Sequence, residues 1–495
     1  MLLWFLPLFL IILMLGLPVI FALLLAPGTL LIADGSTRDL PVLYRNLYNG
    51  IDSFPLMALP FFMLAGEIMN RGGITNRLVE FSQAFMGHLR GGLAHVNILS
   101  SMLFAGLSGS AVADTSALGS TLIPAMEKNG YSRKFAAAIT AASSVIGPII
   151  PPSGIMIIYA YVMGESVAAL FLAGIVPGIL VGAGLMLVVR LMADRYDLPK
   201  AERIVHKNQT ITPLEGVVAS ILVRINIAAL LYGLFVLFRW MFALNVNPNG
   251  WLIFLIMLPV AHGLLVWMKA NVSDDFRLIC KKAVAPLQTP IIILGGILIG
   301  VFTPTEASAI AVAYALVISF FVLRSMSVKD LTGVLARSAL ASSSVLLLVG
   351  AAVAFKTVVS LSFAPQILAE FLTSLSENPL IILFLINILL FIVGMFLDAG
   401  PAIIILGPIL GPIFVDLGVH PVHFAIIMSV NLTVGLATPP MGLVLFVAST
   451  VSREKVETIS KAILPFLAVE VVVIFLITYF PFISMTVPRL AGFVQ

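Results

Sequence analysis

Two acidic residues stand out because each lies in a short polar break between long apolar runs. Asp114 lies in "AGLSGSAVADTS" and Asp398 lies in "LDAGPA". A carboxylate at membrane depth costs about 2.5–3.5 kcal/mol on insertion scales, so each acid needs a compensating partner. A bound cation or the N-terminus of a helix would serve. The residues alone leave both interpretations, ion binding and helix capping, open for the two acids.

Two further motifs place helix-breaking residues inside apolar stretches. They are "GPIIPPSG" at 147–154 and "GLATPPMG" at 435–442. Proline removes a backbone donor and interrupts the helix, so backbone carbonyls and amides become free at membrane depth. Free carbonyls suit Na+, and the N-terminus of a half-helix suits a carboxylate. The motifs therefore predict backbone ligands, with a simple packing kink as the alternative.

The composition indicates the kind of chain that holds these motifs. The 495 residues are 60% hydrophobic and 10% charged, and the mean hydropathy is +1.14. Apolar runs such as 379–397 are too long and too continuous for the strands of a β-barrel. One cysteine and six histidines form no zinc pattern, and scattered Lys and Arg form no nucleic-acid patch. The sequence predicts an all-α polytopic membrane protein in a lipid bilayer, with no nucleic-acid partner.

An internal repeat connects the four motifs. Shifting the sequence by 288 residues aligns 107–158 with 395–446 without a gap, and 12 of the 52 pairs are identical. Seven of those identities are Gly or Pro, and shared apolar composition does not align helix breakers. The chain therefore reads as two homologous halves, and the matched breaks argue against unrelated packing kinks.

The distribution of Lys and Arg orients the halves. Loops rich in these residues are expected in the cytoplasm, and this rule makes both polar tips re-entrant hairpins that enter from opposite sides. The sequence therefore predicts two inverted repeats. They are a first repeat at 1–200 (hairpin about 90–127, broken helix 133–163), a cytoplasmic connection with an extra pair of transmembrane helices at 201–284, and a second repeat at 285–495 (hairpin about 379–416, broken helix 423–450).

Several motifs together resemble a known family. "FAGLSGSAVADTSALGSTLIPAM", "IGPIIPPSG", "LDAGPAIIILGPILGPI" and "NLTVGLATPPMG" are similar to the large membrane (M) subunit of TRAP (tripartite ATP-independent periplasmic) transporters, within the ion-transporter superfamily. The resemblance covers about 1–200 and 285–490. It implies an elevator-type sodium symporter of the bacterial inner membrane that imports an organic acid. The partners implied are a periplasmic solute-binding protein and a small membrane subunit of four helices (Q-type).

The resemblance also implies a set of site residues. The sodium ligands would be Ser108, Ser110, Asp114, Gly147 and Ser153 in the first half, with Asp398, Gly400, Gly435, Thr438 and Pro439 in the second. The substrate contacts would be Ser110, Ala111, Pro152, Ser153, Asn431, Thr438, Pro440 and Gly442.

Other functions stay open at this point. The chain departs from the family pattern by two added apolar runs, at about 216–244 and 251–268, which could replace or supplement the small subunit. A related ion-coupled carboxylate transporter could work without a binding protein. An intramembrane enzyme would need an acid pair, for which Asp114 and Asp398 are the candidates. An ATP-driven pump is excluded because no "GxxxxGK" occurs. We therefore expect a transporter and not an enzyme, with Na+ as coupling ion.

Overall fold

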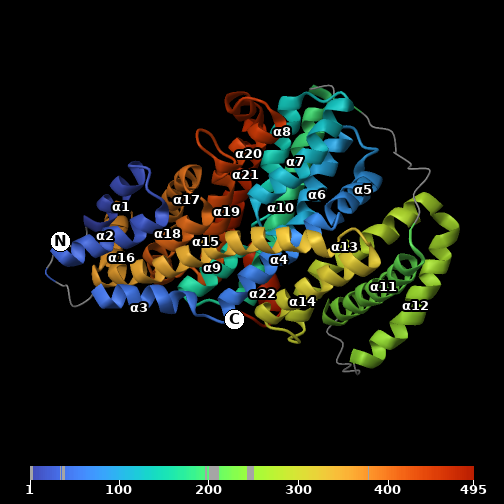
Figure 1. Ribbon diagram of the computed structural model, residues 1–495, viewed down its shortest axis with the longest axis horizontal. Coiled ribbons are helices and arrows are strands. Elements are labelled where there is room, and N and C mark those ends of the chain that lie inside the picture. Colours follow the sequence, from blue (N-terminus) through green and yellow to red (C-terminus); the bar gives the residue numbers. More distant parts are fainter. Residues whose placement is uncertain are drawn as a thin grey trace.

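The computed structural model describes residues 4–33, 35, 40–195, 198–199, 211–241, 250–376 and 378–494 (Figure 1). Every regular element in these ranges is helical. Nine of the described helices are long and apolar enough to cross a membrane, and the bent pair Leu40–Ile51 and Pro55–Arg71 would add a tenth. The sequence-based prediction of an all-α polytopic membrane protein is confirmed.

The helices of the first half run up to residue 195. They are α1 (Phe5–Met14), α2 (Val19–Ala33), α3 (Leu40–Ile51), η3 (Pro55–Met57), α4 (Ala58–Arg71), α5 (Ile74–Met86), α6 (Gly92–Ser108), α7 (Ala111–Lys128), α8 (Arg133–Ser144), α9 (Gly154–Met163) and α10 (Val167–Arg195).

The remaining helices comprise the connection and the second half. They are α11 (Pro213–Met241), α12 (Gly250–Asn271), α13 (Asp274–Leu298), α14 (Pro304–Val317), η4 (Ile318–Val322), α15 (Val328–Leu361), α16 (Ala364–Leu375), α17 (Pro379–Phe396), α18 (Ala399–Asp416), α19 (Pro421–Gly435), α20 (Leu443–Ser452), α21 (Val456–Tyr479) and α22 (Phe482–Leu490).

The helix boundaries repeat at the spacing found in the sequence. A shift of 288 residues carries α7 onto the bounds of α18, and it carries α6 and α9 onto α17 and α20 to within one residue. The same shift carries the bent pair α3 and α4 onto the single helix α15. This order of elements is the one that two repeats would produce. The division of the chain into domains stays a prediction.

The helices pack in two groups that mix both halves of the chain. The core group contains α6–α10 and α17–α22, in which α7 packs on α20, α8 on α21 and α9 on α18. The scaffold group contains α1–α5 and α11–α16, in which α3, α4 and α2 pack on α15. In Figure 1 most of the core group fills the upper part of the view and the long scaffold helices run below it. The two halves therefore interleave instead of forming separate bodies.

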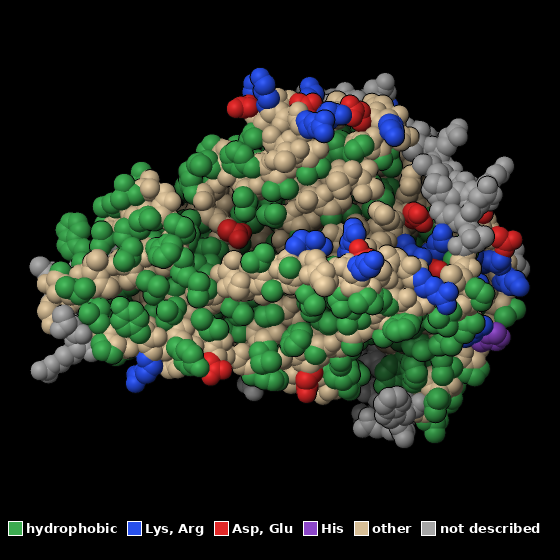
Figure 2. Space-filling model, in the orientation of Figure 1, with side chains coloured by type: hydrophobic (Ala, Val, Ile, Leu, Met, Phe, Trp, Pro, Cys, Tyr) green, Lys and Arg blue, Asp and Glu red, His purple; other side chains and the backbone are tan. Residues whose placement is uncertain are grey.

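The added pair of helices lies on the scaffold group. α11 packs against α12 and α13, and an ion pair between Arg77 of α5 and Glu215 of α11 connects the pair to the first half. Figure 2 shows Lys and Arg mainly at the top, on the right and in a band right of the centre, whereas the left surface is largely hydrophobic. That distribution fits helices that face lipid and charged loops that face water.

One polar contact joins the two groups between α15 and α9. Lys356 Nζ of α15 donates a hydrogen bond to the Val162 carbonyl at 2.5 Å, near the end of α9. The last carbonyls of a helix lack partners within the helix and favour a nearby cation. Lys356 therefore stabilises the end of α9 from the scaffold side.

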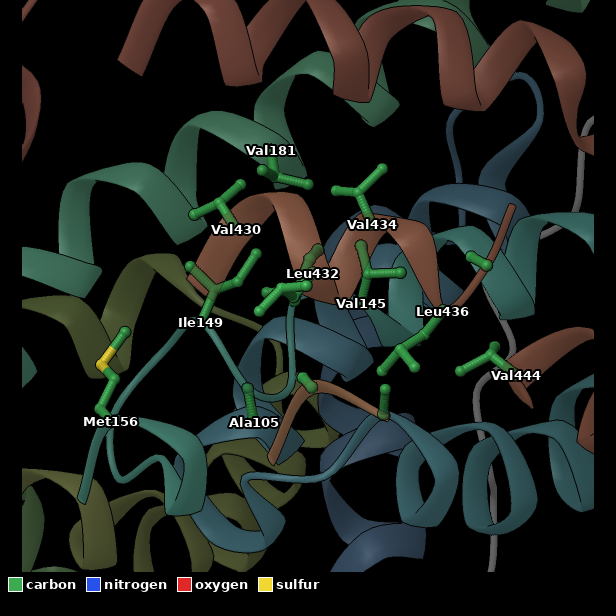
Figure 3. Close-up of a cluster of buried hydrophobic side chains, with 14 of the residues drawn as sticks. Ala105, Val145, Ile149, Met156, Val181, Val430, Leu432, Val434, Leu436 and Val444 are labelled. Carbon is green, nitrogen blue, oxygen red and sulfur yellow. The ribbon is translucent and has the colours of Figure 1, made fainter. Parts of the chain in front are cut away.

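The two breaks have the local structure that their prolines and glycines predict. α8 ends at Ser144 and α9 begins at Gly154, while α19 ends at Gly435 and α20 begins at Leu443. The Pro151–Pro152 and Pro439–Pro440 peptide bonds are both cis. Figure 3 shows apolar side chains of the two segments converging in one buried cluster, including Val145 and Ile149 from the first and Val434 and Leu436 from the second.

A close approach of two backbones makes Gly435 intolerant of a side chain. A Cβ at Gly435 would lie 2.6 Å from both Cα and C of Gly394, at the end of α17. We expect Gly435→Ala to lower the free energy of unfolding by about 1–3 kcal/mol, because neighbouring backbone must move. The melting temperature in detergent measures this. Gly407→Ala is the matched control, since its nearest neighbour would be Met163 Sδ at 3.5 Å. Equal melting temperatures for the two variants would contradict the close approach.

Candidate functional site

A cavity of about 310 Å³ lies where the two hairpin tips meet the scaffold. Its first wall is the α6–α7 tip with the first break, and its second wall is the α17–α18 tip with Leu436 of the second break. Its third wall is formed by α4 and α15. The predicted site residues that line it are Ser108, Ser110, Ala111, Pro152, Asp398 and Gly400. The volume suits a small ligand, because ligand pockets begin at about 300 Å³.

The first tip is a tight connection that only glycine permits. Gly109, between α6 and α7, has φ +59°, and a Cβ there would lie 2.5 Å from the Pro152 carbonyl oxygen. Ser110 then caps α7, because its hydroxyl accepts a hydrogen bond from Ala113 N at 3.4 Å. The tip therefore rests directly on the first break, which brings two of the predicted segments together.

Asp114 lies behind this tip and is fully buried. Its Oδ1 accepts a hydrogen bond from the Ser108 hydroxyl at 3.2 Å, and its Oδ2 has no hydrogen-bond partner among the described residues. Helix capping of α7 by Asp114 is wrong, because Ser110 occupies the cap and Asp114 comes four residues later. An unpartnered carboxylate oxygen in this position fits a bound cation.

Further oxygen atoms surround the first break. A Cβ at Gly147 would lie 3.3 Å from the Ser110 carbonyl oxygen and 3.2 Å from that of Ser144. Ser153 is buried, caps α9, and donates its hydroxyl to the Pro148 carbonyl at 2.5 Å. Hydroxyl, carbonyl and carboxylate oxygens are hard ligands that alkali and alkaline-earth cations prefer. Gly147 and Ser153 lie behind the cavity wall and do not line it.

Asp398 has a different environment from Asp114. It is the N-cap of α18, and its Oδ1 accepts a hydrogen bond from Ala399 N at 2.8 Å. Its side chain is accessible from the cavity. Capping is therefore observed for Asp398, and its Oδ2 accepts no hydrogen bond from the described residues. Because Asp114 does not line this cavity, the two acids do not form the facing pair that an intramembrane enzyme would require.

The second break places its oxygens behind Leu436. The Gly435 carbonyl accepts a hydrogen bond from Thr438 N at 2.9 Å, so one of the two lone pairs of its oxygen is already used. The Thr438 hydroxyl donates to the Val434 carbonyl at 2.8 Å. A Cβ at Gly442 would lie 2.4 Å from the Leu436 carbonyl oxygen, so this turn is packed around backbone oxygens. The predicted residues of this segment that do not line the cavity are Gly435, Thr438, Pro439, Pro440 and Gly442.

Asn431 is not brought to the cavity. Its amide donates to Asn387 Oδ1 at 2.7 Å and to the Ile427 carbonyl at 2.8 Å. The Thr478 hydroxyl donates to the same Asn387 oxygen at 3.1 Å. These residues form a buried polar cluster between α17, α19 and α21. Asn431 therefore does not line the cavity, and its Oδ1 is buried without a hydrogen-bond partner among the described residues.

The scaffold wall of the cavity was missed by the sequence analysis. It consists of Leu59, Phe62 and Met63 from α4 with Ser344, Val345 and Leu348 from α15. A signal was present in "ASSSVLLL", where a run of serines interrupts a long apolar helix. These residues make the cavity an interface between the core and scaffold groups.

Nearly the whole chain matches one family of membrane transporters. Residues 6–483 match the model of the family described as "Tripartite ATP-independent periplasmic transporter, DctM component". The chain is 40% identical to the protein YgiK of Salmonella typhimurium, covering 97% of this chain and 96% of that protein. It is 33% identical to the sialic acid TRAP transporter large permease protein SiaM of Vibrio cholerae, covering 96% and 95%.

A fused relative and a solved structure complete the comparison. The isethionate TRAP transporter permease protein DctMQ of Oleidesulfovibrio alaskensis is 36% identical over 96% of this chain and 64% of that protein. The Alcanivorax borkumensis YdaH transporter structure superposes with a TM-score of 0.54 at 16% identity, covering 90% of this chain and 89% of that chain, which shows a shared fold. The family match spans the helices, both hairpin tips and both breaks, so this chain belongs to the family of large membrane subunits, the DctM component, of tripartite ATP-independent periplasmic transporters.

Proposed function

We propose that this subunit imports an organic carboxylate together with Na+. The observation that supports the proposal is the cavity between the two hairpin tips, with the unpartnered oxygen of Asp114 behind one tip and Asp398 at the other. A cation at each acid would offset the burial of its charge. The N-termini of α7, α9 and α18 lie at this cavity, and their backbone amides would attract the substrate carboxylate.

We infer an order of binding from these charges. A substrate carboxylate that entered a site with two uncompensated acids would face like charges in a medium of low dielectric. Na+ should therefore bind before the organic anion and hold the tips against the breaks. More than one Na+ per substrate would follow, and a monoanion would then move net positive charge inward.

The proposed movement is that of an elevator. The cavity lies between the core group and the α4 and α15 walls of the scaffold group, so sliding one group along the other would carry the site across the membrane. The inverted arrangement predicted for the two halves would allow two equivalent end positions. The core group would be the moving part and the scaffold group the fixed part.

The partners and location are part of the same proposal. The family name describes a tripartite system, and relatives are named for sialic acid and isethionate transport. We infer a periplasmic solute-binding protein that delivers the acid and a small membrane subunit that binds the scaffold group, in the bacterial inner membrane. The fused DctMQ relative supports the small subunit, because the present chain corresponds to 64% of that protein.

Uptake by proteoliposomes tests the coupling ion directly. The purified complex is reconstituted, and the binding protein is loaded with its radiolabelled acid. We expect uptake to rise steeply with external Na+ and to stop when choline replaces it, because the acids in the site would be left uncompensated. A fluorescent potential indicator reports the net charge moved. Equal uptake in choline, with no imposed proton gradient, would overturn the sodium assignment.

A further inference from the structure

A second cavity of about 750 Å³ lies on the other side of the first hairpin tip. Met63, Ser108, Ser110 and Val112 line both cavities. The tip of the α6–α7 hairpin is therefore a thin partition between the site and this larger space, which we call the vestibule.

Two scaffold helices, α15 and α4, form continuous walls from the site to the vestibule. On α15 the lining residues follow a helical spacing from Leu348 in the site through Ser344 and Ala341 to Arg337 in the vestibule. Eleven residues of helix span about 16 Å. On α4 the same face runs from Leu59 to Asn70. A solute that passed the tip would therefore meet Arg337 along a defined path.

The vestibule opens on the side marked by Lys and Arg. The lining residues toward that side include Gly73, Thr75, Asn76, Ser120, Thr121 and Val451. They lie within or near the charged stretches 70–90, 127–134 and 451–461, which carry many of the Lys and Arg residues of the chain and are expected at the cytoplasmic side. The path is therefore the one by which substrate would leave.

The polar groups of the vestibule suit a carboxylate. Arg337 is its only Lys or Arg among the described lining residues, and amides are supplied by Asn70 and Asn76. Arg337 Nε donates to Glu67 Oε1 at 2.5 Å, and Glu67 also lines the space. The Arg337 side chain is 58% exposed, so this contact leaves much of the guanidinium accessible. A guanidinium has five N–H donors and matches a carboxylate with two parallel hydrogen bonds.

We propose that the vestibule contains a second, transient carboxylate-binding site on the release path, with Arg337 as its cation. The proposal rests on the proposed import of an organic acid. The leaving carboxylate accepts hydrogen bonds from Arg337 in competition with Glu67, and the amides of Asn70 and Asn76 lie in the same lining. Once the substrate leaves, Glu67 pairs with Arg337 again. Glu67 thus competes with the substrate and keeps this site weak enough for release.

Thiol labelling tests this site without knowledge of the natural substrate. The chain has one cysteine, so Cys280→Ser gives a background to which Ser120→Cys adds a reporter in the vestibule. The protein is placed in nanodiscs, and the rate of reaction of the reporter thiol is measured with two methanethiosulfonate reagents. One reagent carries an anionic sulfonate group and the other carries a cationic trimethylammonium group. We expect Arg337→Gln to lower the anionic-to-cationic rate ratio about five-fold, and Glu67→Gln to raise it, because each removes one charge near the reporter. An unchanged ratio in Arg337→Gln would overturn the proposal.

A competition experiment distinguishes carboxylate binding at Arg337 from a general electrostatic effect of its charge on the reagents. Succinate should slow labelling in the Glu67→Gln protein, whereas its neutral analogue succinamide should not. The Arg337→Gln, Glu67→Gln double variant restores the net charge, so its rate ratio should return toward that of the parent while protection by succinate stays lost. Protection that persists in the double variant would overturn the site. A neutral thiol reagent checks that the reporter is equally reachable in every variant.

This test is independent of the transport assay. Failure of the parent protein to take up any acid would overturn the proposed function and leave the labelling result intact. Normal uptake, together with an anionic-to-cationic rate ratio that is the same in the parent and in Arg337→Gln, would overturn the second site alone.

Discussion

Replacing Asp114 with asparagine is expected to lower Na+-driven uptake by about 100-fold or more, since removing one partner of a buried charge pair costs about 3–5 kcal/mol. The substitution keeps the shape of the side chain and the acceptor for the Ser108 hydroxyl, and it removes the charge at the unpartnered Oδ2. Uptake by proteoliposomes measures the loss.

The melting temperature of the Asp114→Asn protein in Na+ and in choline shows whether the Asp114 carboxylate binds Na+. Na+ should raise the melting temperature of the parent relative to choline, because a ligand that binds the folded state stabilises it. The Asp114→Asn protein should melt at a similar temperature in both salts. Ser108→Ala is the milder comparison, because it removes the hydrogen bonds of one hydroxyl, to Asp114 Oδ1 and from Ser110 N, and leaves the carboxylate. A full Na+ shift in the asparagine variant would contradict ion binding at Asp114.

At Asp398 two substitutions separate capping from ion binding. Asparagine is as good an N-cap as aspartate, so Asp398→Asn should preserve stability while it weakens the apparent affinity for Na+ about ten-fold. Asp398→Ala should show the same change in affinity and also lose about 1 kcal/mol of stability, because the bond to Ala399 N is lost. The measurements are the Na+ dependence of uptake and the melting temperature.

The comparison between the two variants decides the role of Asp398. If asparagine leaves the Na+ dependence unchanged and only alanine lowers stability, the residue serves as a cap alone. In that case the ion in the second half would have to depend on backbone oxygens near Gly435 and Thr438.

The parts of the fold that follow from local chemistry were predictable from the sequence. Gly109 and the Pro-Pro motifs interrupt helices by their own backbone limits, so the hairpin tips and breaks lie where the sequence placed them. The shift of 288 residues follows from the same residues, because each half needs the same interruptions. Apolar helices between them leave little choice of secondary structure in a bilayer.

The parts that depend on packing between distant helices were not predictable. Asn431 and Thr438 belong to predicted motifs, but neither lines the cavity. The Asn431 amide nitrogen donates to Asn387, and the Thr438 hydroxyl donates to the Val434 carbonyl. Leu59 and Ser344 line the cavity only because α4 and α15 pack beside the tips, more than 200 residues apart in sequence. Spacing along one chain segment carries no information about such a wall.

The bond from Lys356 to the Val162 carbonyl bears on the kinetics of a full cycle. It joins the scaffold group to the core group in the position seen here, and a sliding movement would have to break it. A hydrogen bond to a charged group contributes about 1.5–3 kcal/mol, which corresponds to a population ratio of about ten to a hundred between positions that have it and positions that do not. If the two groups slide past each other as proposed, this bond would favour the position seen here by that ratio, and the need to break it would slow the departure of the empty carrier from this position.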